Sequence, residues 1–348
     1  MRDAHADLVE AGRGADLLLA GLSCTAAPMA AETLGIPWAP AVLQPIAFLS
    51  AQDPCLPPHL HSLAPLLPLG PLIGRPLRIG VRAGLRHLHA PINHLRAELG
   101  LRPFADPMLN GAAEPPLALA LFSPRLAAAQ PDWPAGARPT GAPIHDGTGL
   151  APLAPDTRAW IEAGTPPVLA TLGSSGTRGA RGGTVLRALA GAASGLGRRT
   201  LVLSGSPAVA EDLGELPHTH IRPFVPVEEA MPLAGIVAHH GGAGSTAAGL
   251  RAGRPTLVLP ITGDQFDHAA RLARLGVALV LPAARATPDR VARALQRLAE
   301  VRRFALRAAV IGAEVRQEDG AGAAAALVTA FLRRAAPAPL PRKLALHA

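Results

Sequence analysis

Residues 235–276, GIVAHHGGAGSTAAGLRAGRPTLVLPITGDQFDHAARLARLG, decide the fold class of this chain, because apolar runs alternate in them with helix-like runs. The apolar run from Gly235 to Ala238 is predicted to be a strand that leads through a glycine-rich turn into a helix beginning near Ser245. A second strand, PTLVLP, and a second helix follow. Strands that are apolar at every position indicate a parallel sheet that helices bury on both faces.

The same alternation continues through the second half of the chain. Further strands are predicted at PVLATL, RTLVLSG and VALVLP, and a short one near HIRPF, with helices between most of them. This repetition predicts a doubly wound α/β domain with a parallel sheet. The alanine-rich run from Arg302 to Ala335 is predicted to be helical, and it could either cap this domain or cross back to the first half.

The first half begins with a strand–helix–strand pattern. Residues 15–50 contain a short apolar run, a helix-like stretch that ends at Gly35 and a second apolar run, as in a βαβ unit. Residues 52–80 are dense in Pro and Leu and are predicted to be irregular, whereas residues 83–100 are predicted to form a helix that bears Arg and His. A run rich in Pro, Gly, Asp and Thr at residues 131–155 is the predicted linker between two domains.

Length and composition bound the classes of protein that this chain can be. A chain of 348 residues is long enough for about two domains, each with its own core. The net charge is +8, but the basic residues are scattered and aromatic residues make up only 3%, so nucleic acid is not a predicted partner. No apolar run reaches the roughly 18 residues of a membrane-spanning helix and the start does not resemble a signal peptide, so we expect a cytoplasmic protein. The two cysteines, Cys24 and Cys55, predict neither a disulfide framework nor a zinc site.

The turn HHGGAGST has the chemistry of an anion-binding site. Backbone N–H groups at the start of a helix are unpaired and lie at the positive end of the helix dipole. Gly241, Gly242 and Gly244 would let a diphosphate approach this backbone closely, and the hydroxyl groups of Ser245 and Thr246 could donate to it. An ordinary strand–helix turn with a Ser or Thr cap is the alternative. The turn contains neither the P-loop pattern nor the GxGxxG pattern.

Two spaced motifs, HHGGAGST and a later GDQ that follows a strand ending in Pro, resemble the signature of UDP-glycosyltransferases of the GT-B fold. The similarity is to the bacterial branch that glycosylates natural products, sterols and lipids. It implies two facing Rossmann-like domains: a partial acceptor-binding domain at residues 1–148 and a donor-binding domain at 149–335, followed by a flexible tail at 336–348. It also implies that the donor diphosphate is bound by His240, Gly242, Gly244 and Ser245, and the sugar hydroxyl groups by Asp264 and Gln265.

Three further segments resemble parts of the same family's site. TLGSSGT resembles the first glycine-rich turn of the donor domain, so Ser174 is expected to face the diphosphate, although a generic turn explains it nearly as well. RPFVPVEEAMP resembles the segment that contacts the nucleobase, which implies contacts from Phe224 and Val225. LQPIAFLSAQDP resembles a loop of the acceptor pocket, which implies contacts from Gln44 and Phe48, although core packing explains Phe48 equally well.

Other interpretations apply to several of these residues. Asp53, in the same acceptor-like loop, could also touch an acceptor. Asp264 could merely cap the helix that is predicted to start near Gln265. A metal site is not predicted, because no acidic ligand set at a familiar spacing accompanies the histidines of this region, which are His239, His240 and His268.

The start of the chain differs from the family pattern. The family opens with a strand, a glycine-rich turn and a histidine that deprotonates the acceptor, whereas MRDAHADLVEAGRGADLLLAG resembles a later helix and strand. The resemblance therefore implies that on the order of 90 residues precede this start in an intact relative. It predicts a truncated first sheet with an exposed apolar edge and face, and poor solubility. Nothing around His5 matches the catalytic-base motif, so no catalytic residue is assigned.

The resemblance predicts an inverting hexosyltransferase. It would move a sugar from a nucleotide diphosphate sugar, expected to be UDP-linked, to a small hydrophobic or natural-product acceptor, with no cofactor besides the donor and with these two small molecules as its partners. A nucleotide-sugar-binding remnant without efficient transfer is the first alternative. An epimerase would need acid and base carboxylates that the sequence does not show, and a nicotinamide oxidoreductase would need a GxGxxG turn in its first βα unit.

Overall fold

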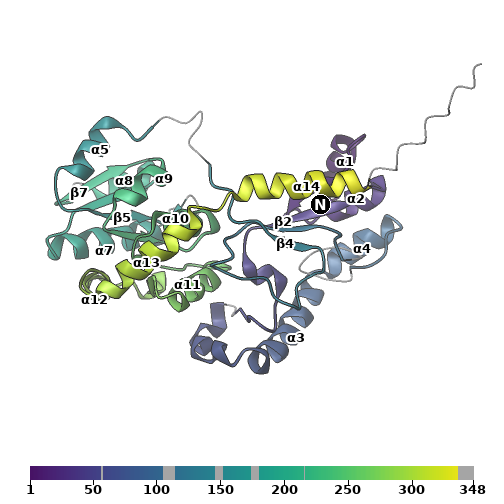
Figure 1. Ribbon diagram of the computed structural model, residues 1–348, viewed down its shortest axis with the longest axis horizontal. Coiled ribbons are helices and arrows are strands. Elements are labelled where there is room, and N and C mark those ends of the chain that lie inside the picture. The colour runs from purple at the N-terminus through teal and green to yellow at the C-terminus, as the bar shows by residue number, and fades with distance from the viewer. Residues whose placement is uncertain (56–57, 105–113, 146–151, 174–179, 215, 336–348) are drawn as a thin grey trace, which may run out of the picture.

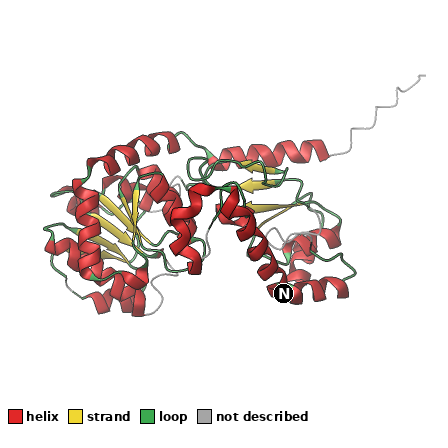
Figure 2. Cartoon of the chain, turned by 90° about the horizontal axis from the view of Figure 1, so that it is seen from below, coloured by secondary structure: helices red, strands yellow, loops and turns green. Residues whose placement is uncertain are grey.

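The computed structural model describes residues 1–55, 58–104, 114–145, 152–173, 180–214 and 216–335, and these form two lobes that are each built on a parallel sheet (Figure 1). The first sheet has the order β1-β2-β3-β4, with strands Leu18–Gly21, Trp38–Val42, Ala118–Ala120 and Ala137–Pro139. The second has the order β10-β9-β8-β5-β6-β7. In chain order its strands are Val168–Thr171, Thr200–Leu203, Thr219–Arg222, Ile236–His239, Thr256–Val258 and Ala278–Val280. Figure 2 shows the two sheets as separate groups of strands.

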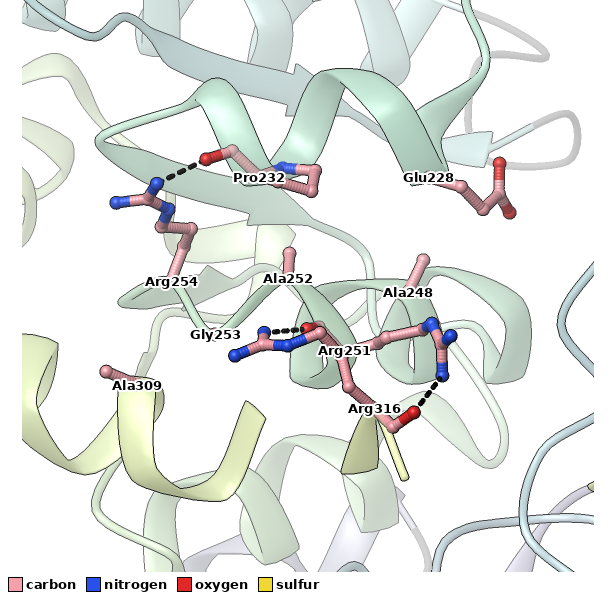
Figure 3. Close-up of a pocket in the computed structure, with 9 residues that line it drawn as sticks. All are labelled: Glu228, Pro232, Ala248, Arg251, Ala252, Gly253, Arg254, Ala309 and Arg316. Carbon is pink, nitrogen blue, oxygen red and sulfur yellow. Dashed lines mark hydrogen bonds between the residues drawn. The ribbon is translucent and has the colours of Figure 1, made fainter. Parts of the chain in front are cut away.

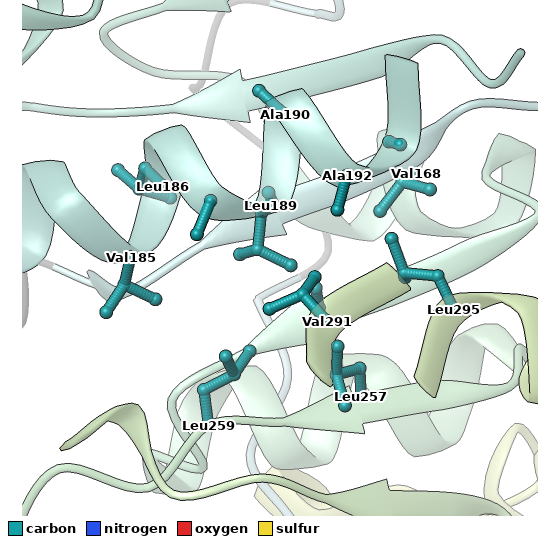
Figure 4. Packing of buried hydrophobic residues seen from close by; sticks show 14 of the residues in the cluster. Val168, Val185, Leu186, Leu189, Ala190, Ala192, Leu257, Leu259, Val291 and Leu295 are labelled. Atoms are coloured by element: carbon teal, nitrogen blue, oxygen red, sulfur yellow. The ribbon is translucent and has the colours of Figure 1, made fainter. Parts of the chain in front are cut away.

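Helices bury the second sheet on both faces, as the uninterrupted apolar strands predict. Helices α7 (Ala180–Gly195) and α12 (Pro288–Glu300) pack on one face, where Val168 and Ala170 of β5 point (Figure 4). Leu169, between them in sequence, belongs to the cluster on the other face, under α9 (Val227–Ala230) and α10 (Ala243–Ala252). Successive strand residues point to opposite faces, so a strand covered on both sides has to be apolar throughout.

Further helices pack in the described part of the second lobe. They are α5 (Pro155–Glu162), α8 (Pro207–Leu213) and α11 (Gln265–Arg274). Helix α13 (Arg302–Val315) packs against α10. Among the described helices, none is long and apolar enough to cross a membrane.

The first lobe takes its last helix from the end of the chain. Helix α14 (Gly320–Ala335) packs Leu327 and Phe331 against Leu119 of β3, so the chain crosses back to the first sheet. Helix α2 (Ala27–Leu34) contacts β1 and β2, and α1 (Arg2–Ala11) packs on α2. The predicted domain limit at 148 and the predicted tail at 336–348 lie outside the described residues.

The expectation of an irregular segment at residues 52–80 is wrong for most of its length. A 3₁₀ helix, η2, spans Pro58–Leu69, and α3 spans Pro71–Leu88 before α4 at Ala90–Glu98. Pro71 lies in the first turn of α3, where the missing N–H of proline costs nothing. Pro58 and Pro71 therefore mark helix starts, whereas Pro76 lies inside α3.

Two kinds of contact join the lobes. Phe48, Phe122 and Trp133 of the first lobe share a buried apolar cluster with Leu272 and Ile311 of the second. An ionic contact from the segment after the short 3₁₀ helix η1 (Pro45–Phe48) to α11 adds to it, as described below.

Candidate functional site

The candidate site lies where the order of the second sheet changes direction. From β5 the chain runs outward through β6 and β7, then returns to place β8 on the other side of β5. Thr171 at the end of β5 is in register with His239 at the end of β8. In open α/β sheets, ligands bind beyond the carboxyl ends of the strands at such a switch point.

Two buried histidines fix the glycine-rich turn after β8 by holding both polar groups of Gly241. The N–H group of Gly241 donates to Nδ1 of His239 at 2.9 Å, and Nδ1 of His268 donates to the carbonyl oxygen of Gly241 at 2.7 Å. Gly241 has φ 91°, and a Cβ atom there would lie 2.9 Å from the carbonyl oxygen of Gln265. Only glycine meets both conditions.

These hydrogen bonds assign the protons of both rings. His239 accepts at Nδ1, so its proton is on Nε2, whereas His268 donates from Nδ1. Burial, together with smaller contributions from the neighbouring His240 and His268, lowers the pKa of His239 to about 3. His239 is therefore a neutral structural residue of the turn.

His240 lies between two glycines from adjacent strand ends. A Cβ atom on Gly173 would lie 2.6 Å from its ring, and one on Gly242 would also collide with the ring. Burial lowers the pKa of His240, Asp264 opposes this shift, and His268 adds to it. Nδ1 of His240 is buried and has no hydrogen-bond partner among the described residues. A neutral imidazole is thus fixed at the switch point.

Helix α10 begins beside this ring. Gly242 is its N-cap in an extended conformation, and α10 starts at Ala243, two residues before the predicted start near Ser245. A Cβ atom on Gly244 would meet open space, so a ligand can approach the first turn there. The unpaired N–H groups of a first helical turn and the dipole favour an anion at this position.

Thr246 does not fit the role that the sequence assigns to it. Its side chain is only 1% exposed and its hydroxyl group is buried. It therefore faces the interior of the second lobe and not the open side of the first turn of α10. Ser245 is half-buried and is the hydroxyl residue of the pair that remains accessible.

Asp264 and Gln265, the predicted sugar-binding pair, differ in the hydrogen bonds that their side chains already make within the protein. Asp264 precedes α11 but makes no side-chain cap hydrogen bond, and its carboxylate is partly exposed, with Oδ2 lying 3.9 Å from Nδ1 of His268. The capping interpretation therefore fails. Oε1 of Gln265 accepts from the N–H groups of Ile261 at 2.8 Å and Thr262 at 3.1 Å. The amide oxygen of Gln265 therefore already holds the loop, and its amide nitrogen is the group that remains for the predicted contact with a sugar.

The remaining predicted residues lie in different environments. Phe224 is 66% exposed after β7, whereas the side chain of Val225 is buried in the core. Phe48 is corrected from an acceptor-pocket residue to a core residue, because it is buried and stacks on Trp133 with ring centroids 4.3 Å apart. Gln44 is half-buried before η1. Ser174 lies outside the described residues.

An ionic cluster at the lobe junction was not anticipated as such by the sequence. Arg271 of α11 is 2% exposed, and its Nε donates to Asp267 at 2.9 and 3.0 Å. Its Nη1 donates to Asp53 of the first lobe, and its Nη2 lies 3.0 Å from Sγ of Cys55. Arg274 also donates to Asp53, at 2.9 Å. The spacing of Asp267 and Arg271, four apart on one helix, was the available local signal.

The pKa values at the junction follow from burial and charge together. Burial alone would raise the pKa of Asp53, but Arg271 and Arg274 outweigh it and hold that pKa below its ordinary value. Burial raises the pKa of the Cys55 thiol, and Asp267 raises it further. Asp53 is therefore an anion that links the lobes, and Cys55 is a neutral thiol.

A second cavity lies at the far end of α10, with a volume of about 470 Å³ (Figure 3). Two arginines that line it already donate hydrogen bonds to backbone carbonyl oxygens: Arg316 to that of Arg251 at 2.7 Å, and Arg254 to that of Pro232. In the part of the chain that the structure describes, no three His, Cys, Asp or Glu side chains gather as a metal site would require.

Comparisons with known proteins agree with this arrangement. Residues 200–328 match the family model described as "Erythromycin biosynthesis protein CIII-like, C-terminal domain". The chain is 34% identical over 242 residues to O-mycaminosyltylonolide 6-deoxyallosyltransferase of Streptomyces fradiae, covering 69% of this chain and 56% of that protein. The chain is also 36% identical to an uncharacterized glycosyltransferase of Mycobacterium bovis, and this match covers 52% of this chain and 43% of that protein. The chain therefore spans about half the length of these curated relatives.

Solved structures show the same fold. The glycotransferase of kitacinnamycin aligns with a TM-score of 0.67 at 23% identity, over 95% of this chain and 81% of that chain. The glycosyltransferase VinC, solved in complex with DTDP, aligns with a TM-score of 0.61 at 23% identity, over 95% and 75%. Both sheets are therefore arranged as in these natural-product glycosyltransferases.

Proposed function

We propose, from the GT-B fold of the chain and the EryCIII-like C-terminal glycosyltransferase domain of residues 200–328, that it transfers a sugar from a nucleotide diphosphate sugar to a small hydrophobic or natural-product acceptor. One observation carries the proposal. The start of α10 lies at the switch point of the sheet, is held by His239 and His268 through Gly241, and is open above Gly244.

The proposed reaction is a direct displacement with inversion. An acceptor oxygen forms a bond to the anomeric carbon of the sugar, and the bond from that carbon to the diphosphate breaks, with its electron pair leaving on the diphosphate. The first turn of α10, Ser245 and the imidazole of His240 would stabilise that charge. The acceptor proton passes to a base that we do not assign. Asp264 would accept hydrogen bonds from the sugar, and Gln265 would donate to it from its amide nitrogen.

The nucleobase is proposed to lie over the segment after β7, where the side chain of Phe224 is exposed. The buried side chain of Val225 leaves only its backbone for this role. UDP is the nucleotide that the sequence motifs imply, and thymidine diphosphate is the alternative, because VinC was solved in complex with DTDP.

A binding protein without efficient transfer is the second candidate. His5, the histidine nearest the start, is buried, and its Nε2 lies 3.0 Å from Oγ1 of Thr33, so it is engaged within the first lobe. Nucleotide binding without release of UDP or dTDP from any donor in the presence of phenolic, macrolide and lipid acceptors would favour this candidate over transfer.

Two helical glycines give a matched test of the diphosphate site. Gly244 of α10 and Gly191 of α7 both have open space where a Cβ would be. Gly244→Leu would fill the space that the diphosphate needs, so we expect at least a roughly tenfold loss of affinity for UDP and dTDP by calorimetry. Gly191→Leu should bind as the wild type does. Equal affinities in the two variants would contradict the proposed site.

A further inference from the structure

The segment from η2 to α3 carries a line of exposed aliphatic side chains. In a 3₁₀ helix, residues three apart lie above one another. Leu63, Leu66 and Leu69 have this spacing in η2, and all three are exposed. Leu72, three residues further on at the start of α3, is 77% exposed. Gly70, between Leu69 and Leu72, is not helical (φ 54°, ψ −122°), so the four exposed leucines stand on two helices that follow one another in the chain.

Helix α3 extends this line along its outer face. Leu72, Pro76, Ile79 and Ala83 recur at the spacing of one face of an α-helix, and all four are exposed, Ile79 to 71%. The opposite face is fixed on the first lobe at Gly74, where a Cβ atom would lie 2.7 Å from backbone atoms of Ala51. The docking of α3 therefore presents the aliphatic face outward, at the edge of the first lobe (Figure 1).

This aliphatic ridge lies in a stretch without negative charge. No Asp or Glu occurs between Asp53 and Glu98, whereas five arginines do, of which Arg78 pairs with Asp132 and the buried Arg96 pairs with Glu32. Arg75 and Arg86 are exposed and border the ridge on α3, at positions that fall on one side of it. An exposed apolar line of this length marks an interaction site in a water-soluble fold.

We propose that the η2–α3 ridge binds the surface of a bilayer that contains anionic lipid. Aliphatic side chains would enter the boundary between headgroups and acyl chains, while the flanking arginines reach the headgroup phosphates. The surface potential of anionic lipid favours each such arginine by an amount that corresponds to about a fivefold gain in affinity. This surface is formed by other elements than the switch-point site, although η2 contacts α11, and it does not depend on the proposed transfer reaction.

The positive charge of the ridge favours an anionic bilayer over a second copy of the chain as its partner. In a symmetric dimer, the same patch faces itself, so the arginines of one ridge would meet a surface that carries the same arginines and, in this segment, no acidic residue. Among the described residues of this segment, no acidic side chain could compensate, because the sequence has none from 54 to 97. An anionic bilayer supplies the missing charge.

Vesicle flotation tests the proposal with the whole chain. Wild-type protein should float with phosphatidylcholine vesicles that contain phosphatidylglycerol, and added salt should weaken this binding. Ile79→Asp should lower the affinity for the vesicles roughly ten- to a hundredfold, because it replaces an apolar side chain that would be buried in the bilayer with a charged one. Arg75→Gln should lower it about fivefold. Leu306→Asp, at another exposed aliphatic position on α13, is the matched control and should float as the wild type does.

Three outcomes would overturn the proposal: no flotation of the wild type, equal flotation with pure phosphatidylcholine, or equal loss in Ile79→Asp and Leu306→Asp. Thermal unfolding should show that both variants fold, since both positions are exposed. A concentration-dependent dimer that Ile79→Asp abolishes, without vesicle binding, would instead make the ridge an interface between copies.

Discussion

The glycine-rich turn and the lobe junction are both held by α11, but by different kinds of interaction. His268 of α11 reaches back to Gly241 with an imidazole, whereas Arg271, one turn later, reaches across to Asp53 with a full charge. The turn is thus fixed by hydrogen bonds to imidazole rings, and the junction by buried ions. The first bonds join residues of two neighbouring turns, while the ions hold surfaces from distant parts of the chain together.

The largest loss of stability is expected from a substitution that breaks the junction. Arg271→Ala leaves Asp267 and Asp53 without their partner, so we expect a loss of about 3–5 kcal/mol in the free energy of unfolding, measured by urea denaturation. Arg2→Ala removes an exposed ion pair with Glu98 and should cost at most about 1 kcal/mol. Similar losses in both variants would mean that the junction is no stronger than a surface pair.

The next effect concerns ligand binding at the turn. His240→Ala removes a neutral donor from the proposed diphosphate site, and a hydrogen bond to a charged group is worth about 1.5–3 kcal/mol. The dissociation constant for UDP or dTDP should therefore rise by roughly ten- to a hundredfold in calorimetry. His94→Ala, an exposed histidine of the first lobe, is the control. Unchanged nucleotide affinity in His240→Ala would remove His240 from the site.

Lowering the pH should weaken the turn and the junction in different pH ranges. The pKa of His239 is about 3 in the fold against an ordinary 6.5, so the unfolded chain binds more protons between these values. Stability from His239 is then complete above pH 6.5 and falls by about 1.4 kcal/mol per pH unit as the pH drops below it. For Asp53 the folded pKa is below the ordinary 3.8, so its contribution is present above 3.8 and is lost only as the pH falls through the folded value.

His239→Gln isolates this difference, since an amide oxygen can still accept from Gly241. Between pH 6.5 and 5, the stability of the variant should fall less steeply than that of the wild type. The difference between the two slopes should approach the value for one bound proton. Parallel pH profiles would show that His239 is not the group that titrates.

The smallest expected effect distinguishes the sugar from the nucleotide. Asp264→Ala should lower the affinity for a UDP- or dTDP-hexose by about 0.5–1.5 kcal/mol, less than a buried hydrogen bond to a charged group because the carboxylate is partly exposed, and should spare the free nucleotide. Asp289→Ala, in the first turn of α12, is a control of the same chemistry. Equal weakening of hexose and nucleotide binding would indicate that Asp264 shapes the turn rather than contacting the sugar.

The sequence by itself determined the doubly wound sheet, the position of the glycine-rich turn and the resemblance to glycosyltransferases of the GT-B fold. These follow from short-range patterns: strands apolar throughout, helices between them, and glycines at a position with φ 91° or in contact with the ring of His240. Such features are local, because backbone conformation and burial on both faces constrain each residue from its neighbours in sequence.

Only the tertiary structure decided which side chains are available. Thr246 turns inward, the oxygen of Gln265 is used by its own loop, and Phe48 is stacked in the core. The link from Asp53 to Arg271 joins residues 218 positions apart, so no local pattern could reveal it. Exposure and ion pairing depend on which distant surface packs against a residue, and the chain fixes that only once it has folded.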